Sequence, residues 1–459
     1  MSSTLPVAPP SLNLFKEIVE RTKKYIKNDE NLQKAIALTM ISASLKDPIN
    51  LFIAAPSSEG KTWPTRQMVR AFPEDKVMLL AGLTNESIKY LPHTTNSKGD
   101  RIVDLTGWLI IFLEAPSEDV FKRIRPLLSH DDPEITYLVV EKQRKSKDES
   151  KKIEQYEVTK IKLRGWPATI WLDSRPRWLA DLVTRGYNVG PKMGHEKYEA
   201  ANVLTGKRMT YPWSFDLWDE AEFAGIRELL TTAGQYLKGI EEIVIPYGEK
   251  LASVYPHQLG RDMRDLTRLM ALIKAHAAYN VLQRPVFAFD NPSIASPKKY
   301  LIAGPADYEE IYSLFEDLYL STRSGVPQHI VNFYRELFIE KSGQRREYSG
   351  FKGIQEEWSK NHNNEIFPKA TLSDYLGLLE TVGWVHVEPD PTDKRRNIYT
   401  GVMSIGQDQT LDKIVRQMFG ESISSFFSPE DLQNWLNEVQ KNSSVKLYEN
   451  DINPGGWVP

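Results

Sequence analysis

Short apolar runs alternate with helical patterns over the first half of the chain. Three such runs occupy residues 51–55, 77–80 and 109–113, and a fourth occupies residues 168–172. Apolar residues at three- and four-residue spacing fill much of the sequence between them, as on one face of a helix. This alternation predicts a parallel sheet covered by helices, and therefore an α/β fold class.

The same patterns divide the rest of the chain. Residues 11–47 show helical periodicity, and residues 219–282 are almost wholly helical in pattern. The predicted order is an N-terminal helical segment (1–48), an α/β core (49–218), a helical lid and linker (219–324), a compact C-terminal domain (325–405) and a C-terminal helical tail (406–459).

The C-terminal domain has a recognisable order of elements. Helical patterns cover residues 328–341, 350–361 and 371–382, and two strand patterns follow at 384–388 and 397–402. Three helices and a β-hairpin predict a winged helix-turn-helix.

Composition narrows the class of protein. The 459 residues are 41% hydrophobic and 26% charged, as in ordinary globular proteins, and the net charge of −3 gives no overall attraction to nucleic acid. The chain has no cysteine, which excludes disulfides, thiolate metal sites and a cysteine nucleophile. Because no signal sequence and no run of about 18 apolar residues is present, we expect a cytoplasmic protein without membrane segments.

The most informative motif follows the first apolar run and precedes a helix. It consists of Ala55, Pro56, Ser57, Ser58, Glu59, Gly60, Lys61 and Thr62. In a P-loop of this spacing, backbone N–H groups and the helix N-terminus bind phosphates. Gly60 allows close approach, Lys61 reaches the β- and γ-phosphates, and Thr62 ligates Mg²⁺, so ATP and Mg²⁺ are the expected cofactors. The alternative is a chance Gly-Lys-Thr in a strand-to-helix turn.

A second strand is expected to bring a carboxylate beside the phosphates. The run at 109–113 ends in Glu114, which would orient water for in-line attack on the γ-phosphate. The position before it is Leu113, where an acid that could hold the metal is usual. An ordinary strand-terminal acid is the alternative reading of Glu114.

The order of these motifs resembles an AAA+ ATPase, in particular the helicases of mobile elements and phages related to minichromosome-maintenance and superfamily III motors. The resemblance covers roughly residues 30–284. It implies that residues 168–174 form the sensor-1 strand, with Asp173 or Ser174 near the γ-phosphate. It also implies that Arg264, rather than Arg261, contacts the nucleotide from the lid.

The resemblance further identifies Arg185 as an arginine finger inserted into a neighbouring subunit, and so implies a homo-hexameric ring. A fixed guanidinium would neutralise the charge on the transferring phosphoryl group. Arg175 and Arg177 are alternatives for this role, and a surface ion pair with Asp181 is the structural alternative for Arg185.

Residues 135–164 read as two strands, 135–140 and 156–163, around a basic tip. The basic residues of this tip are Lys142, Arg144, Lys145, Lys147, Lys151 and Lys152. The segment resembles the pre-sensor-1 hairpin, which would line a ring pore and follow a phosphate backbone. A solvated loop is the alternative, because acidic residues interrupt the basic run.

The winged helix offers a second DNA contact. Its third helix could enter a major groove with Thr371, Ser373, Asp374 and Tyr375. Its wing could bind phosphates through Lys394, Arg395 and Arg396. Protein docking is the alternative use of such a domain.

These features predict an ATP-dependent, ring-forming DNA helicase or translocase, of a mobile element or virus, acting on single-stranded or duplex DNA. The alternative is a DNA-binding initiator or helicase-loader switch that does not unwind DNA, which the missing acid at Leu113 favours. A protein-remodelling ATPase is a third reading, and the charged hairpin tip speaks against it.

Overall fold

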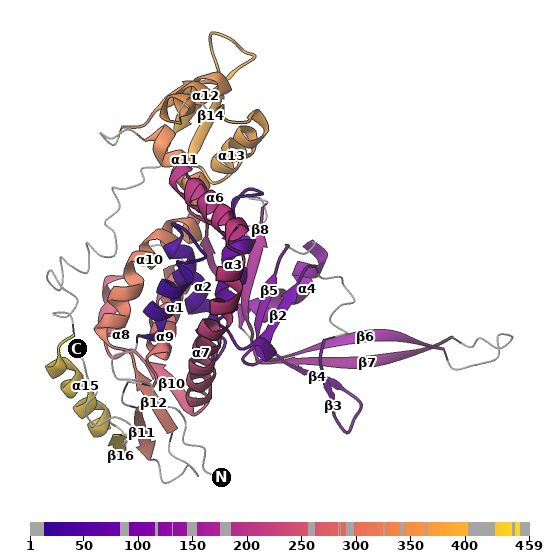
Figure 1. Ribbon diagram of the computed structural model, residues 1–459, viewed down its shortest axis with the longest axis vertical. Helices are drawn as coiled ribbons and strands as arrows, with labels where there is room; N and C mark the ends of the chain where they lie inside the picture. Colours follow the sequence, from indigo (N-terminus) through magenta and orange to yellow (C-terminus); the bar gives the residue numbers. More distant parts are fainter. Residues whose placement is uncertain are drawn as a thin grey trace.

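Figure 1 shows the computed structural model of the chain, in which a mixed α/β body carries a long hairpin on one side and a smaller helical unit at one end. The structure describes residues 13–82, 91–114, 118–130, 132–144, 154–174, 185–255, 262–282, 284, 286–290, 298–324, 326–339, 344–362, 364, 366–402, 427–442 and 446–449.

The centre of the body is a parallel five-stranded sheet, as the alternation of apolar runs predicts. Its strands are β1 (Asn50–Ala54), β2 (Val77–Leu80), β5 (Leu109–Phe112), β8 (Ala168–Asp173) and β9 (Tyr187–Val189). They lie in the order β2-β5-β8-β1-β9, and every neighbouring pair is parallel. The α/β fold class is therefore confirmed, while β9, with only three residues, was not predicted.

Both faces of this sheet are buried at β1, β5, β8 and β9, which explains the continuous apolar runs of its central strands, whereas the edge strand β2 is partly exposed. Along β1, Leu51 and Ile53 belong to one hydrophobic cluster, whereas Phe52 joins the cluster on the other face. The first face is covered mainly by α1 (Leu14–Thr22), α2 (Glu30–Ser42), α3 (Thr62–Val69), α9 (Asp262–Tyr279) and α10 (Pro305–Ser324). Side chains of α4 (Glu118–Ser129) pack on the second face.

A second sheet carries the predicted hairpin. The arms are β6 (Glu134–Arg144) and β7 (Glu154–Arg164), which pair without a bulge from Glu134↔Arg164 to Arg144↔Glu154. β4 (Arg101–Asp104) pairs in parallel with β7, and β3 (Thr94–Thr95) pairs with β4. The hairpin projects far from the body (Figure 1).

The region predicted to be a helical lid is not purely helical. Helices α7 (Trp213–Leu237), α8 (Gly248–Val254), α9 and α10 are interrupted by β10 (Ile240–Val244), β11 (Val286–Asp290) and β12 (Lys298–Ile302). The acidic pair Glu241 and Glu242 makes β10 look like a continuation of α7 in sequence. The strand forms because it pairs in parallel with β12, a contact between distant segments.

The C-terminal unit (residues 327–402) has its own hydrophobic core. It contains α11 (Gln328–Phe338), α12 (Gly350–Asn361) and α13 (Lys369–Thr381), close to their predicted positions. A three-stranded antiparallel sheet follows, ordered β13 (Glu347–Ser349), β15 (Asn397–Gly401), β14 (Val385–Pro389). The strand β13 was not predicted.

The end of the chain returns to the body, so the predicted helical tail is only partly helical. Helix α15 (Pro429–Asn442) places Leu432 in the main core, and strand β16 (Lys446–Glu449) pairs antiparallel with β11. Lys250 on α8 forms an ion pair with Asp431, with 3.3 Å between Nζ and Oδ1.

Candidate nucleotide-binding site

The predicted phosphate loop lies between β1 and α3, at the carboxyl edge of the parallel sheet. Ser58 and Gly60 have φ values of 72° and 79°, so the loop needs left-handed backbone at two positions, and one of them is not glycine. The Ala55 amide donates to the Asp173 carbonyl at 3.2 Å, which ties the loop to β8. The motif therefore has the strand-loop-helix context that a phosphate loop requires.

Lys61 is already held over the loop. Its Nζ donates to the carbonyl oxygens of Ala55 and Pro56, at 2.6 and 2.7 Å. Burial lowers the pKa of the ammonium group, and the nearby carboxylates of Asp173 and Glu59 oppose this shift. The ammonium group of Lys61 therefore lies at the loop, where it can exchange these carbonyl oxygens for phosphate oxygens.

The other predicted residues of the carboxyl edge are also present there. Asp173 is buried at the end of β8, Ser174 follows it exposed, and Glu114 is exposed two residues beyond the end of β5. Since β8 lies between β1 and β5, two strand spacings, about 10 Å, separate the ends of the strands that lead to the loop and to Glu114. This distance leaves room for a γ-phosphate and a water molecule.

A magnesium ion would rely mainly on oxygen ligands outside the protein. Thr62 is exposed at the first position of α3, where its hydroxyl can serve as one ligand. Among the described residues, no group of three His, Asp or Glu side chains is close enough to hold a metal. Phosphate oxygens and water would complete the coordination, which suits Mg²⁺.

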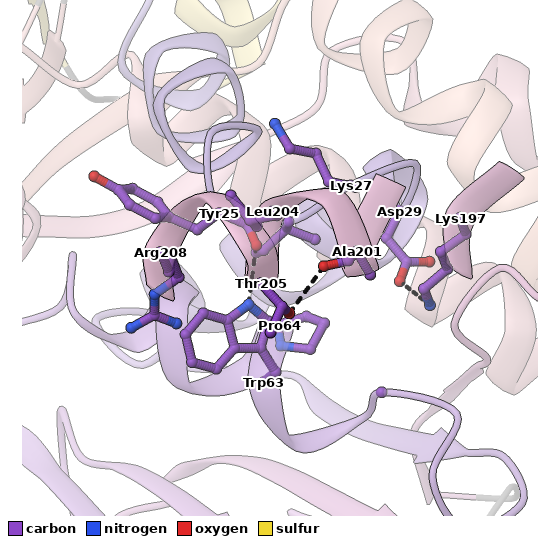
Figure 2. Close-up of a pocket in the computed structure, with 12 residues that line it drawn as sticks. Tyr25, Lys27, Asp29, Trp63, Pro64, Lys197, Ala201, Leu204, Thr205 and Arg208 are labelled. Carbon is purple, nitrogen blue, oxygen red and sulfur yellow. Dashed lines mark hydrogen bonds and ion pairs between the residues drawn. The ribbon is translucent and has the colours of Figure 1, made fainter. Parts of the chain in front are cut away.

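A cavity of about 310 Å³ opens beside the loop (Figure 2). It is lined by Tyr25, Ile26, Lys27, Asp29, Gly60, Trp63, Pro64, Lys197, Ala201, Leu204, Thr205 and Arg208. Trp63 is fixed by a 2.9 Å hydrogen bond from Nε1 to the Tyr25 carbonyl, and the Arg208 guanidinium lies 4.6 Å from its ring centre. Aromatic walls with a few polar groups are typical of sites for planar ligands.

Helix α6 (His195–Thr210) closes one side of this site through contacts that the sequence did not reveal. Lys197 forms a buried ion pair with Asp29 at 2.5 Å, visible in Figure 2, and its Nζ lies 3.4 Å from the Glu59 carbonyl oxygen. The Tyr198 hydroxyl donates to the Glu59 carboxylate at 2.6 Å. Only Lys197 and Leu204 of the helix are buried, so its sequence carries little periodic signal.

The C-terminal unit reaches the same loop. The His329 ring on α11 donates a hydrogen bond to the Ala54 carbonyl, and its centre lies 5.4 Å from that of Tyr375 on α13. Tyr375 is only 5% exposed and also packs on Phe333 and Phe367. The prediction that Tyr375 faces a DNA groove is therefore wrong, whereas Ser373 and Asp374 are exposed.

One predicted arginine, Arg185, lies at the opposite, amino edge of the sheet. Arg185 precedes β9, and its carbonyl accepts from the Asn50 side-chain amide at 3.0 Å. The Tyr187 hydroxyl donates to the carbonyl of Arg268, one turn beyond Arg264 on α9. The five residues of β1, about 16 Å, separate this edge from the loop. Arg264 is exposed on α9, and its expected contact with the nucleotide stays a prediction. Arg175, Arg177, Asp181 and Arg261 lie outside the described residues.

The predicted DNA contacts are partly described. Arg144 is the last residue of β6, whereas Lys145, Lys147, Lys151 and Lys152 lie outside the described residues. On the arms, Leu138, Val140 and Val158 are exposed on the same face as Lys160. In the C-terminal unit, Lys394, Arg395 and Arg396 are exposed between β14 and β15, and Asp393 pairs with both arginines.

Comparison with models of known protein families and with curated proteins gives no match to this chain. Within the part of the chain that the structure describes, no helix has both the length and the apolar character needed to cross a membrane.

Proposed function

We propose that the chain is an ATP-binding P-loop protein of the AAA+ type that hydrolyses ATP at sites shared between subunits. The observation that carries this proposal is the loop itself: Lys61 is pre-positioned over two loop carbonyls, at the carboxyl edge where Asp173 and Glu114 also lie. The cavity with Trp63 and Arg208 would take the base, next to the loop that takes the phosphates.

Each residue then has a defined task. Lys61 and the loop amides bind the β- and γ-phosphates, and Thr62 provides one oxygen ligand to Mg²⁺. Glu114 orients the attacking water, with Ser174 or Asp173 beside it. Arg185 lies too far from the loop of its own subunit, so a neighbouring copy would supply it, and a homo-hexameric ring is the assembly we propose.

We further propose that the assembly acts on DNA as a helicase or translocase. The long hairpin β6–β7, with Lys160 and Lys162 on its arms and a basic tip sequence, is the element suited to following a phosphate backbone. The residues Lys394, Arg395 and Arg396 offer a second phosphate contact, in a unit whose elements suit a winged helix.

A loader or initiator switch without unwinding activity is the second candidate. It is favoured by one specific observation, that Leu113 occupies the position before Glu114 where a metal-holding acid is usual. Such a protein would bind ATP and DNA but turn over slowly.

ATP hydrolysis with and without DNA tests the proposal. We expect Mg²⁺-dependent ATPase activity that single-stranded or duplex DNA stimulates severalfold, and that Lys61→Ala removes because the phosphates lose their fixed cation. Lys160→Ala with Lys162→Ala should weaken DNA stimulation and leave basal turnover intact. ATPase activity that DNA does not change would contradict the helicase or translocase proposal. Strand displacement by the protein alone would exclude a loader or initiator switch without unwinding activity.

A further inference from the structure

The C-terminal unit packs directly against the phosphate loop. A Cβ atom built on Gly190, just after β9, would lie 3.4 Å from the Gln328 Cβ and 3.3 Å from the Ala54 carbonyl oxygen. Helix α11 therefore lies close to the end of β1. The next residue, His329, donates to the same Ala54 carbonyl. The contact thus involves the residue that leads into the loop.

A second contact reaches the middle of the loop. Tyr198 of α6 holds the Glu59 carboxylate at 2.6 Å. Tyr375 of α13 packs on the His329 ring, with 5.4 Å between the ring centres, and burial and then the nearby Glu59 raise the pKa of its hydroxyl. The loop is thereby held from α6 and from the C-terminal unit at once.

These contacts flank a backbone conformation that is costly on its own. Ser58 has φ of 72°, a left-handed value that a non-glycine residue adopts only when its surroundings enforce it. Residues on both sides of Ser58 are restrained, at Ala54 by His329 and at Glu59 by Tyr198. Restraint before binding reduces the conformational entropy that ligand binding must overcome.

We propose that His329 and Tyr375 are positioning residues of the nucleotide site, supplied by the C-terminal unit, which hold the phosphate loop in the shape that accepts a nucleoside triphosphate. This inference rests on the proposed function of the loop. Because coupling between two binding events is reciprocal, a bound nucleotide must tighten the docking of the unit by the same factor.

Nucleotide binding by variants gives the first test. Tyr375→Phe removes only the hydroxyl and keeps the ring in the core of the unit, while His329→Gln keeps a neutral donor that His329→Ala lacks. We expect ATP with Mg²⁺ to bind three- to tenfold more weakly to Tyr375→Phe and His329→Ala, with partial recovery in His329→Gln. Asn332→Ala, exposed on the same helix, should bind as the parent does. Affinities within twofold of the parent for all variants would overturn the inference.

A disulfide gives the reciprocal test, since the chain has no cysteine of its own. In Gly190→Cys with Gln328→Cys, the two Cβ atoms would lie close to disulfide spacing. We expect ATP to speed bond formation in mild oxidant at least threefold, and to have no effect when Lys61→Ala is added. No bond under any condition, or a rate that ATP leaves unchanged, would contradict the coupling. A parent chain that binds no ATP would instead overturn the proposed function, and this inference with it.

Discussion

The two edges of the parallel sheet hold different halves of the proposed chemistry. The carboxyl edge carries the phosphate loop, Asp173 and the docked C-terminal unit, whereas the amino edge carries Arg185 and the base of the hairpin. The hairpin belongs to the amino edge because β7 ends at Arg164, four residues before β8 begins. Under the proposed function, one chain has the parts for binding ATP and for completing its hydrolysis, but Arg185 would act only in the site of a neighbouring copy.

Substitutions at Lys61 and at Arg185 test separately what each edge of the sheet contributes, and they should have the largest effects. Lys61→Ala should abolish nucleotide binding, while Arg185→Ala should preserve binding and lower kcat by about 10³, as loss of an arginine finger does. If the sites are shared, mixing the two inactive variants should restore a measurable fraction of ATPase activity. The new sites would take Lys61 from one chain and Arg185 from the other.

Two outcomes would refute the shared site. Turnover retained by Arg185→Ala would remove the finger assignment. Alternatively, the mixture could stay as inactive as its components although the variants assemble together, as judged by mass measurement in solution. A variant that carries both changes in the same chain serves as the control. It should show no ATPase activity on its own, because no pair of its chains can combine Lys61 with Arg185.

Packing at the amino edge can be tested through Gly186, which precedes β9. A Cβ at this position would lie 2.3 Å from the Asn50 carbonyl oxygen, so Gly186→Ala should destabilise the fold by about 2–4 kcal/mol. Gly206→Ala is the matched control. It lies inside α6 with no atom within 4 Å of the new carbon, and should stabilise by about 0.5 kcal/mol. Denaturant unfolding measures both, and equal stabilities would contradict the close approach of β9 to β1.

The stability of the folded chain should depend on pH through His329, which lies at the carboxyl edge of the sheet. Burial lowers the pKa of His329 to about 4, from an ordinary value near 6.5. Between these values the unfolded chain binds a proton that the folded chain does not, so stability falls as the pH drops from 6.5 towards 4. Lys61 lies nearby and disfavours the charged ring. The loss should be on the order of 1–3 kcal/mol.

His329→Gln should flatten that part of the pH profile, because glutamine does not titrate. Urea unfolding at several pH values, followed for both proteins, measures the difference. An identical pH dependence in the two proteins would show that His329 does not remain neutral in the folded chain.

Local signals in the sequence predicted much of this fold. The strand before Ala55, the loop and the helix after Thr62 follow from spacing alone. The apolar runs of β5 and β8 follow because both faces of the sheet are buried there. Helices α11, α12 and α13 were equally clear from their periodicity.

Contacts between distant segments could not be predicted in the same way. Lys197 and His329 look like ordinary helical residues, and only the fold brings them to the loop from about 140 and 270 residues away in sequence.

The last strand has a practical consequence for handling the protein. β16 covers the outer edge of β11, so a chain cut after residue 402 to isolate the core would leave that edge unpaired. Exposed strand edges promote association between molecules. Shortened versions should therefore be judged for aggregation before any loss of activity is assigned to the missing segment, and an affinity tag is better placed at the N-terminus.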